Sequence, residues 1–536
     1  MKWRALVVLS AAQFLMVLDQ AVMNVSISQL VEDFETSVTT IQAVITFYAL
    51  MMATTMMTGA KIGDIIGRRR AFTIGLVVYG AGSALTAASW NVPTLLLGWS
   101  VLEGIGAALV LPALVTLIAA NYEGTDRVAA FGVIGGVAGV GIAAGPIVGG
   151  YFTSNLSWRW VFVGEVILAT LIVATSRWIG DTPPLPRRPR LDVGGAILSA
   201  VGLGLVVIGM LQAGSWGFLA PKNSPIEPFG FALTPFVVLA GGVVLWTFAA
   251  WERREEAAGR DPLVRLDLLA NVRLRSGLAC LLNQSVILLG VFFTLPLYLQ
   301  IVLGFDAFDT GLRMLPISIA MFLTSSMGPV LANRFGPRRV VQAGFVVDAI
   351  AAFAMLETIK ADLDGPGFGA ALVLLGIGMG LIASQLGNVV TSSVSSEDRG
   401  EAGGLQYTAQ QLGSAVGTAL IGAVVIGALI TAFINNIDDD ERIPSELSAA
   451  IEVDLAAGAN FVAADVVEDG LVEAGVSTDE TAAIVERYRE AQLQALRTGL
   501  LLAAFLAVVS LVFTRYLPEE AHAVGHDEED EPASAT

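Results

Sequence analysis

The amino-acid sequence predicts an all-α integral membrane protein, and three observations support this fold class. The chain has 536 residues, of which 55% are apolar and only 15% are charged, whereas soluble domains are about 25% charged. It contains fourteen apolar stretches, each long enough for the roughly 20 residues that a helix needs to cross a bilayer. Its single cysteine, Cys280, excludes a disulfide framework, and its two histidines, His522 and His526, lie in the polar tail.

The expected spans follow one another along the chain, and each is bounded by a charged or Gly/Pro-rich turn. The first follows a basic start, but it contains Asp19 and no clean cleavage site follows, so we expect an uncleaved helix rather than a signal peptide. The ranges are 5–28, 41–60, 71–90, 94–119, 130–152, 161–180, 193–213, 231–251, 277–303, 310–332, 339–359, 366–388, 404–432 and 496–517.

The distribution of lysine and arginine predicts the orientation, because cytoplasmic segments carry an excess of both. With the N-terminus in the cytoplasm, 22 of the 30 basic residues fall in cytoplasmic segments and eight outside. We therefore expect a multi-pass protein of the plasma membrane with both termini in the cytoplasm. The acidic segment 433–495 is then outside, where the ranges 445–457 and 478–496 are expected to form short amphipathic helices.

A repeated turn divides the expected spans into two halves. A turn that reads Gly-Asp-Ile-Ile-Gly-Arg-Arg-Arg at 63–70 follows the second span, and a weaker copy at 333–339 follows the tenth. Repeated halves are a signature of transporters in which two bundles move around a shared site. The predicted units are an N-terminal six-helix bundle (1–180), a linker with two extra helices (181–276), a C-terminal six-helix bundle with a long outside loop (277–517) and a disordered acidic tail (518–536).

The turn at 63–70 is a candidate conformational switch. Asp64 is placed to cap the next helix and to pair with arginines across the gap between the halves. A pair that forms in one state and breaks in the other biases a two-state equilibrium. Gly67, Arg68 and Arg69 complete this candidate. The alternative is that the basic residues only anchor the turn at the membrane surface.

Glycines recur through the fifth span at a spacing that lets two helices approach closely. The proline in this stretch removes a backbone donor and can kink the helix. One interpretation is a hinge between the halves that helps to seal a proton pathway, and the alternative is generic tight packing. The residues concerned are Gly141, Gly145, Pro146, Gly149 and Gly150.

Four stretches of the chain resemble the major facilitator superfamily, and specifically its fourteen-span drug:proton antiporter family. They are 18–25 in the first span, the turn at 63–70, the Gly/Pro stretch 141–150, and 295–305. The resemblance implies a major-facilitator-like fold of two six-helix bundles plus two linker helices. It also implies multidrug efflux, in which an antiporter exchanges protons for amphipathic or cationic small molecules by alternating access. The proton gradient would drive it without a cofactor, and the partners would be the substrate, protons and the bilayer, with a monomer expected.

The chain departs from that family's pattern at several positions. Ala60 stands where the family turn has glycine, and Ser100 stands where the family has an arginine linked to proton transfer. Glu103 lies near that missing arginine, and Glu165 occupies a position that is often asparagine. We therefore expect the coupling chemistry to be built around carboxylates.

Four acidic residues fall inside expected spans, where charged groups are costly and mark candidate functional sites. Burial favours the neutral form of a carboxyl group. Such a group can bind a proton and release it when a cation arrives or when the site opens to the other side. Asp19, Glu103, Glu165 and Asp348 are therefore the candidate proton-coupling residues, with Asp19 first because it lies in the family's first-span motif. The alternative for each is a buried acid that is hydrogen-bonded to a neighbouring helix.

Flexible thioether side chains and amphipathic side chains are the candidates for contact with the substrate. The alternative for each of them is that it only packs in the core. The candidates are Asn24, Met52, Met56, Asn283, Gln284, Tyr298 and Gln300. Nothing in the sequence suggests a metal site, a nucleophile–base pair, a nucleotide-binding loop or a nucleic-acid partner, so an enzyme is not expected. A narrow-specificity exporter of a metabolite or lipid-like compound, and a non-transporting scaffold or sensor, are the alternatives to multidrug export.

Overall fold

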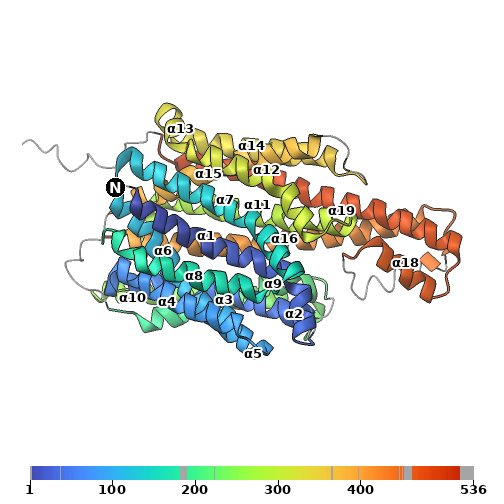
Figure 1. The fold of residues 1–536 in the computed structure, drawn as a ribbon, viewed down its shortest axis with the longest axis horizontal. Coiled ribbons are helices and arrows are strands. Elements are labelled where there is room, and N and C mark those ends of the chain that lie inside the picture. Colours follow the sequence, from blue (N-terminus) through green and yellow to red (C-terminus); the bar gives the residue numbers. More distant parts are fainter. Residues whose placement is uncertain are drawn as a thin grey trace, which may run out of the picture.

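The computed structural model describes most of the chain, and its secondary structure there is helical throughout (Figure 1). The described residues are 3–519 without 37, 182–189, 222–223, 362, 364–365, 396, 446, 449–450 and 452–460. The expected acidic tail 518–536 lies almost entirely outside them.

The first part of the chain forms a bundle of nine helical segments and a short 3-10 turn. They are α1 (Arg4–Val25), α2 (Ile27–Asp33), α3 (Val38–Ile66), α4 (Arg68–Ala87), α5 (Val92–Leu95), the π-helix η1 (Leu96–Glu103), α6 (Gly104–Asn121), α7 (Gly124–Asn155), α8 (Arg159–Thr175) and η2 (Ser176–Trp178). We call this set the N-terminal half.

The remaining elements form a linker and a second bundle. The linker contains α9 (Val193–Trp216), η3 (Pro228–Gly230), α10 (Thr234–Ala257) and η4 (Leu266–Ala270). The C-terminal half contains α11 (Val272–Pro296), the π-helix η5 (Leu297–Val302), α12 (Ala307–Ser326), α13 (Gly328–Phe335), α14 (Pro337–Thr358), α15 (Gly367–Ser392), α16 (Arg399–Asp438), α18 (Ala464–Glu473), α19 (Thr478–Phe513) and η6 (Thr514–Tyr516).

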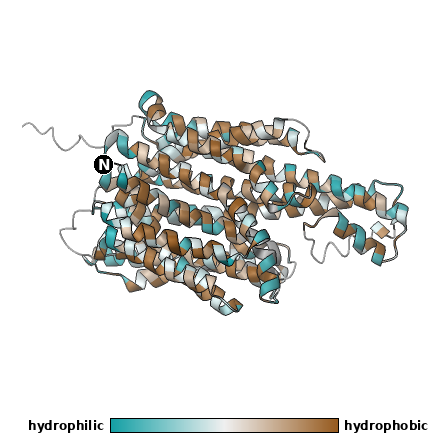
Figure 2. Cartoon of the chain, in the orientation of Figure 1, coloured by the Kyte–Doolittle hydropathy of each residue, from teal (hydrophilic) through white to brown (hydrophobic). Residues whose placement is uncertain are grey.

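Twelve helices in the described chain are long and apolar enough to cross a membrane. They match twelve of the fourteen expected spans, and the other two, 71–90 and 310–332, correspond to α4 and α12, which have 20 residues each. α4 packs against α6 and α8, and α12 packs against α7 and α15. Figure 2 shows apolar residues along the helices of the main body. The all-α membrane fold is thus confirmed, and the count of fourteen crossings stays a prediction.

The buried apolar side chains form two large clusters. One is drawn from residues between 5 and 179 together with Tyr407, and the other from residues between 248 and 517. Two bundles with separate cores would give this pattern, although the bounds predicted for the units stay a prediction. The halves meet along α7 with α12 and α15, and along α16 with α3 and α6.

The linker helix α9 lies on the seam between the two halves. It packs against α3 and α16 as well as against its partner α10. A small apolar cluster joins the three helices through Ala53, Val207 and Ala415. The linker therefore touches both halves at once.

Two helices of the C-terminal half project from the main body together with α18 (Figure 1). α16 has 40 residues, which corresponds to about 60 Å, or twice the hydrocarbon thickness of a bilayer. α19 has 36 residues and begins at a capping box formed by Ser477 and Glu480. It contains the expected helix 478–496, whereas most of the expected helix 445–457 lies outside the described residues. We call the described residues between 433 and 495 the projecting unit.

An ion-pair network joins the segment that directly follows α16 to α19 in the projecting unit. Asp440 accepts hydrogen bonds from Arg442 Nη2 at 2.7 Å and from Arg487 Nε at 2.8 Å. Arg442 also reaches Glu486 at 2.9 Å. The two guanidinium groups hold the pKa of Asp440 well below its usual range.

This network predicts how the projecting unit responds to pH and to mutation. A carboxyl group with a lowered pKa stabilises the fold above its unfolded-state pKa, which is about 3.9, and loses that contribution as the pH falls through the lower folded-state value. The unit should therefore resist proteolysis equally well at neutral pH and near pH 5. Asp440→Asn should speed cleavage between α16 and α19 at neutral pH, whereas the exposed neighbour Asp439→Asn should not. Equal cleavage of both variants would contradict the proposed role of the network.

Candidate functional site

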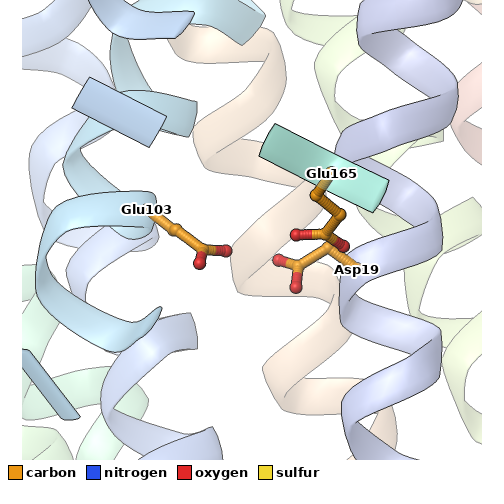
Figure 3. A group of neighbouring side chains, drawn as sticks. All are labelled: Asp19, Glu103 and Glu165. Carbon is orange, nitrogen blue, oxygen red and sulfur yellow. The ribbon is translucent and has the colours of Figure 1, made fainter. Parts of the chain in front are cut away.

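Three of the four intramembrane acids meet inside the N-terminal half. Asp19 comes from α1, Glu103 from the end of η1 and Glu165 from α8 (Figure 3). One oxygen of each carboxyl group lies within 4.8 Å of an oxygen of each of the other two. Asp19 and Glu103 are fully buried, and Glu165 is 2% exposed. We call these residues the acid cluster.

Close contact between α4 and η1 positions the acid cluster. A Cβ atom on Gly82 would lie 2.7 Å from Glu103 Cγ, and one on Gly98 would lie 2.8 Å from the backbone nitrogen of Thr86. Glycine at both positions therefore lets the two helices touch. Glu103 is the last residue of the π-helix η1, and π-helical turns occur frequently at functional sites.

Each carboxyl group of the cluster accepts a hydrogen bond at one of its oxygens. Trp99 Nε1 donates to Asp19 Oδ1 at 2.7 Å, and Thr86 Oγ1 donates to Glu103 Oε1 at 3.2 Å. The hydroxyl groups of Ser83 and Tyr79 donate to Glu165 Oε2 at 3.2 and 3.3 Å. α4 and η1 thus supply all of these donors.

The second oxygen of each acid has no hydrogen-bond partner. Asp19 Oδ2, Glu103 Oε2 and Glu165 Oε1 are all buried and unpaired, and Tyr48 Oη is a further buried atom without a partner. The Tyr48 ring stacks on Trp99 with the ring centroids 4.5 Å apart. None of the ion pairs between described residues involves the cluster. A buried carboxylate without a counter-charge is costly, so the arrangement favours groups that take up protons.

The fourth acid, Asp348, lies apart from the others, in α14 of the C-terminal half. It is 1% exposed, and neither of its oxygens has a partner. A Cβ atom on Gly378 of α15 would lie 2.1 Å from Asp348 Oδ1. Asp348 is therefore a separate buried acid against the backbone of a neighbouring helix.

The candidate switch turn is closed by local contacts. Asp64 pairs with Arg68 of the same turn, and Arg68 Nη1 donates to the Ala60 carbonyl at 2.9 Å. Arg69 forms an ion pair with Asp181, which likewise lies close to the N-terminal half. The expectation that Asp64 caps the next helix is wrong, because Gly67, with φ +100°, occupies the cap position and supplies no side chain.

A different pair at this end of the molecule joins the two halves. Lys61 Nζ of α3 lies 3.1 Å from Glu401 Oε1 of α16, and both side chains are buried. The other oxygen of Glu401 accepts a hydrogen bond at 3.0 Å from the backbone nitrogen of Arg265, which lies in the linker between α10 and η4. Arg265 also pairs with Asp398. Close by, Arg127 of α7 donates to Asn388 of α15 at 2.9 Å.

The glycines of the Gly/Pro stretch pack mainly against α1. Cβ atoms on Gly141, Gly145 and Gly149 would lie 3.0 Å from Val17, 2.1 Å from Ala21 and 3.2 Å from Val22. Gly150 faces Phe308 of α12 instead, where the contact is 3.5 Å. The side chain of Pro146 lies outside the described residues. The stretch thus holds α7 to the helix that carries Asp19, and its far end reaches the other half.

The predicted substrate residues do not form one group. Met52 Sδ lies within 3.5 Å of Gln20 Nε2 in α1 and 3.4 Å of Gln411 Nε2 in α16, so it lies between the halves. Met56 is buried in the N-terminal core. The side chain of Asn24 lies outside the described residues.

The C-terminal candidates differ in their surroundings. Asn283 donates to the Ala279 carbonyl of its own helix at 2.8 Å. Gln284 is buried, and Gln300 is exposed. Tyr298 is fully buried and donates to the Lys360 carbonyl at 2.8 Å, which places it against the chain that follows α14 rather than in a shared space with Met52.

Sequence reasoning missed the residues that surround the acid cluster and those that join the halves. Trp99 directly precedes Ser100, the position of the missing arginine, and Tyr79, Ser83 and Thr86 recur at helical spacing along α4. A polar stripe at this spacing inside an apolar span was the available signal. Lys61 and Glu401 are 340 positions apart, and no local pattern links them.

The chain matches the family model of the Major Facilitator Superfamily over residues 9–418. It belongs to this superfamily, and it is a multi-pass membrane transporter rather than an enzyme. The resemblance seen in the sequence is thereby confirmed at the level of the superfamily. The fourteen-span drug:proton antiporter branch stays a prediction.

Several curated relatives are named for export or drug resistance. The probable actinorhodin transporter of Streptomyces coelicolor is 32% identical over 84% of this chain and 77% of its own length. The puromycin resistance protein pur8 of Streptomyces alboniger is 33% identical over 80% of this chain and 82% of its own. The multidrug resistance protein Stp of Mycobacterium tuberculosis is 24% identical over 96% of this chain and 92% of its own.

Solved structures of the superfamily share the fold. The human organic anion transporter MFSD10 superposes with a TM-score of 0.57 at 14% identity, over 96% of this chain and 99% of its own. The proton:xylose symporter XylE superposes with a TM-score of 0.56 at 14% identity, over 98% of this chain and 97% of its own. At this identity the likeness concerns the fold alone.

The contact between α7 and α1 yields a stability prediction. Gly145→Val should force the two helices apart, and overpacking of this kind costs about 1–3 kcal/mol. We expect the apparent melting temperature of the detergent-solubilised protein to fall by several degrees in a fluorescence-detected size-exclusion assay. Gly242→Val in α10, where nothing lies within 4 Å of the added Cβ, is the matched control. An unchanged melting temperature for Gly145→Val would show that α1 is not held here.

Proposed function

We propose that this transporter is a proton-coupled antiporter of the fourteen-span drug:proton family. It exports drugs or other amphipathic or cationic small molecules across the plasma membrane by alternating access. The observation that carries the proposal is the acid cluster, in which three buried carboxyl groups meet without a basic partner among the described residues. Both termini lie in the cytoplasm and the projecting unit lies outside, as the excess of basic residues in the cytoplasmic segments favours.

The acid cluster has the properties that exchange requires. A group that is protonated while it is buried can release its proton when the surrounding helices open toward water. A cation that enters the opened site then competes with the proton for the same negative charge. A proton-motive force of roughly 150 mV supplies about 3.5 kcal/mol per proton. At about 1.4 kcal/mol per tenfold, one proton sustains a gradient of several hundredfold for an uncharged substrate.

Alternating access is supported by the polar contacts between the halves at the end that carries the 63–70 turn. Lys61 and Glu401 are both buried there, and Arg127 and Asn388 add a second contact. Removal of one member of a buried ion pair leaves an uncompensated charge and costs roughly 3–5 kcal/mol. The cytoplasmic ends must therefore exchange these contacts for water when they separate.

The names of the relatives support a small-molecule substrate. They differ in whether they mention one compound or many. One is named for multidrug resistance and two for a single compound each, actinorhodin and puromycin. Narrow export of one metabolite or lipid-like compound is therefore the second candidate. Competition between chemically unrelated cations for one binding signal would favour the broad alternative.

A proteoliposome experiment tests proton coupling. The purified protein is reconstituted with an acidic lumen that contains a pH dye, and tetraphenylphosphonium, ethidium or puromycin is added outside. We expect proton efflux that depends on the added compound, and a decrease of at least about tenfold in Asp19→Asn, which corresponds to about 1.4 kcal/mol.

The control for this experiment is Glu252→Gln in the linker helix α10. Glu252 is also a fully buried acid with one unpaired oxygen, but it lies outside the acid cluster. Efflux in this variant should match that of the wild type. Efflux of undiminished size in Asp19→Asn, or no efflux with any compound, would reject the proposal in its present form.

Cross-linking tests the contact between the halves. Cys280, the single native cysteine, is buried and will not compete for thiol reagents. In a variant with Lys61→Cys and Glu401→Cys, a short bifunctional thiol reagent should join α3 to α16 and stop exchange, because the cytoplasmic ends can no longer separate. The untreated double variant and Lys61→Cys alone show whether the substitutions themselves matter. Continued exchange in the cross-linked protein would place the moving contact elsewhere.

A further inference from the structure

The hydrogen-bond donors around the acid cluster are unequally distributed between the two oxygens of each carboxyl group. One oxygen of each carboxyl group accepts from a fixed donor, and those donors are the indole of Trp99 and three hydroxyl groups of α4. The other three carboxyl oxygens, one on each acid, accept from no described group. Since an indole nitrogen only donates and a carboxylate only accepts, the protein does not complete this network by itself.

No positively charged side chain of the described residues acts on the three acids. The titratable groups that face them are Tyr48 of α3 and Tyr79 of α4, which are both neutral at physiological pH. Tyr79 already donates to Glu165, and the Tyr48 hydroxyl has no partner. Of the ion pairs between described residues, none reaches the three acids. The Tyr48 hydroxyl can donate to one of the unpaired oxygens, and added cations, of which the proton is the smallest, can satisfy the others.

The short separation of the three acids limits how many of them can be ionised together. Three carboxylates this close together in an apolar interior cannot all be ionised, because like charges within a shared site oppose one another. One bound proton would still leave two negative charges in contact. Two bound protons leave a single negative charge among three acids whose nearest oxygens lie within 4.8 Å of one another. Carboxyl groups this close titrate as a unit.

We propose that Asp19, Glu103 and Glu165 form one proton-binding centre that holds two protons in the buried state and releases both in each transport cycle. This inference rests on the proposed function and adds its stoichiometry. Exchange of two protons for one monovalent cation moves one net charge across the membrane. Transport should then respond to the membrane potential as well as to the pH gradient, since the potential acts on net charge.

Infrared spectroscopy tests the proton content without any transport. The carbonyl stretch of protonated carboxylic acids is recorded for the full-length protein at neutral pH, and each variant is subtracted from the wild type. We expect the variant with Asp19→Asn, Glu103→Gln and Glu165→Gln to lack the intensity of two protonated acids. Glu103→Gln and Glu165→Gln are measured singly as well, so that one variant that fails to fold does not end the test. Glu252→Gln of α10 serves as the matched control for a buried acid outside the centre. A difference of one protonated acid, of three or of none would overturn the inference.

The same spectra distinguish protons from metal ions. They are repeated in Na⁺, in Mg²⁺, in Ca²⁺ and with a chelator, at one pH. Spectra that do not change with these ions support a proton centre. A saturable loss of the protonated-acid signal on addition of one of the ions, absent from the triple variant, would show that a metal cation completes the network and would overturn the two-proton assignment.

A gradient experiment then measures the stoichiometry in transport. With the membrane potential clamped at zero, a tenfold proton gradient should sustain a tetraphenylphosphonium gradient of about a hundredfold if two protons exchange, and about tenfold if one does. We expect the hundredfold value in the wild type and the Glu252→Gln control. A tenfold value would overturn the inference while proton antiport stands. No substrate gradient at all, with two protonated acids in the spectra, would instead reject the proposed function and leave a proton centre with another role.

Discussion

The interaction on which the site depends is the burial of three carboxyl groups against one another, with no basic partner in the part of the chain that the structure describes. Asp19, Glu103 and Glu165 come from three separate helical segments, and hydroxyl and indole donors satisfy one side of each group. An isolated carboxylate in such surroundings is unstable. The stability of this arrangement therefore depends on how many protons the acids hold. In the proposed antiport cycle, this dependence links the proton gradient to helix movement.

Close helix packing is the second requirement, because the acids meet only if their helices do. Gly82 and Gly98 bring α4 against η1, and Gly145 brings α7 against α1. A methyl group at any of these positions would occupy the space of a neighbouring backbone or side chain. The glycine-rich composition of the chain thus serves the site directly. It sets the distance between the helices that carry the acids and those that carry the donors.

Much of this architecture could be predicted from the sequence, since span length, charge bias and the repeated turn are local features. The acids were found because a charge inside an apolar stretch is conspicuous. The place where the three acids meet could not be predicted, because packing between distant segments decides that α1, η1 and α8 lie side by side. The π-helical turn before Gly104 has no visible signal, and the pairing of Lys61 with Glu401 depends on the contact between halves. Asp64 was expected to pair across the halves, but the reversal at Gly67 turns Arg68 back onto it.

The continuity of α16 through the projecting unit has a mechanical consequence. The apolar core of the C-terminal half extends without interruption to Phe433, Ile437 and Tyr488, so the unit moves as part of that half. A tilt of 10° would displace the end of a helix about 60 Å long by about 10 Å. In the proposed alternating-access cycle, small rotations of the C-terminal half would become large displacements at the far end of the projecting unit, where a fluorophore on α18 would report each turnover.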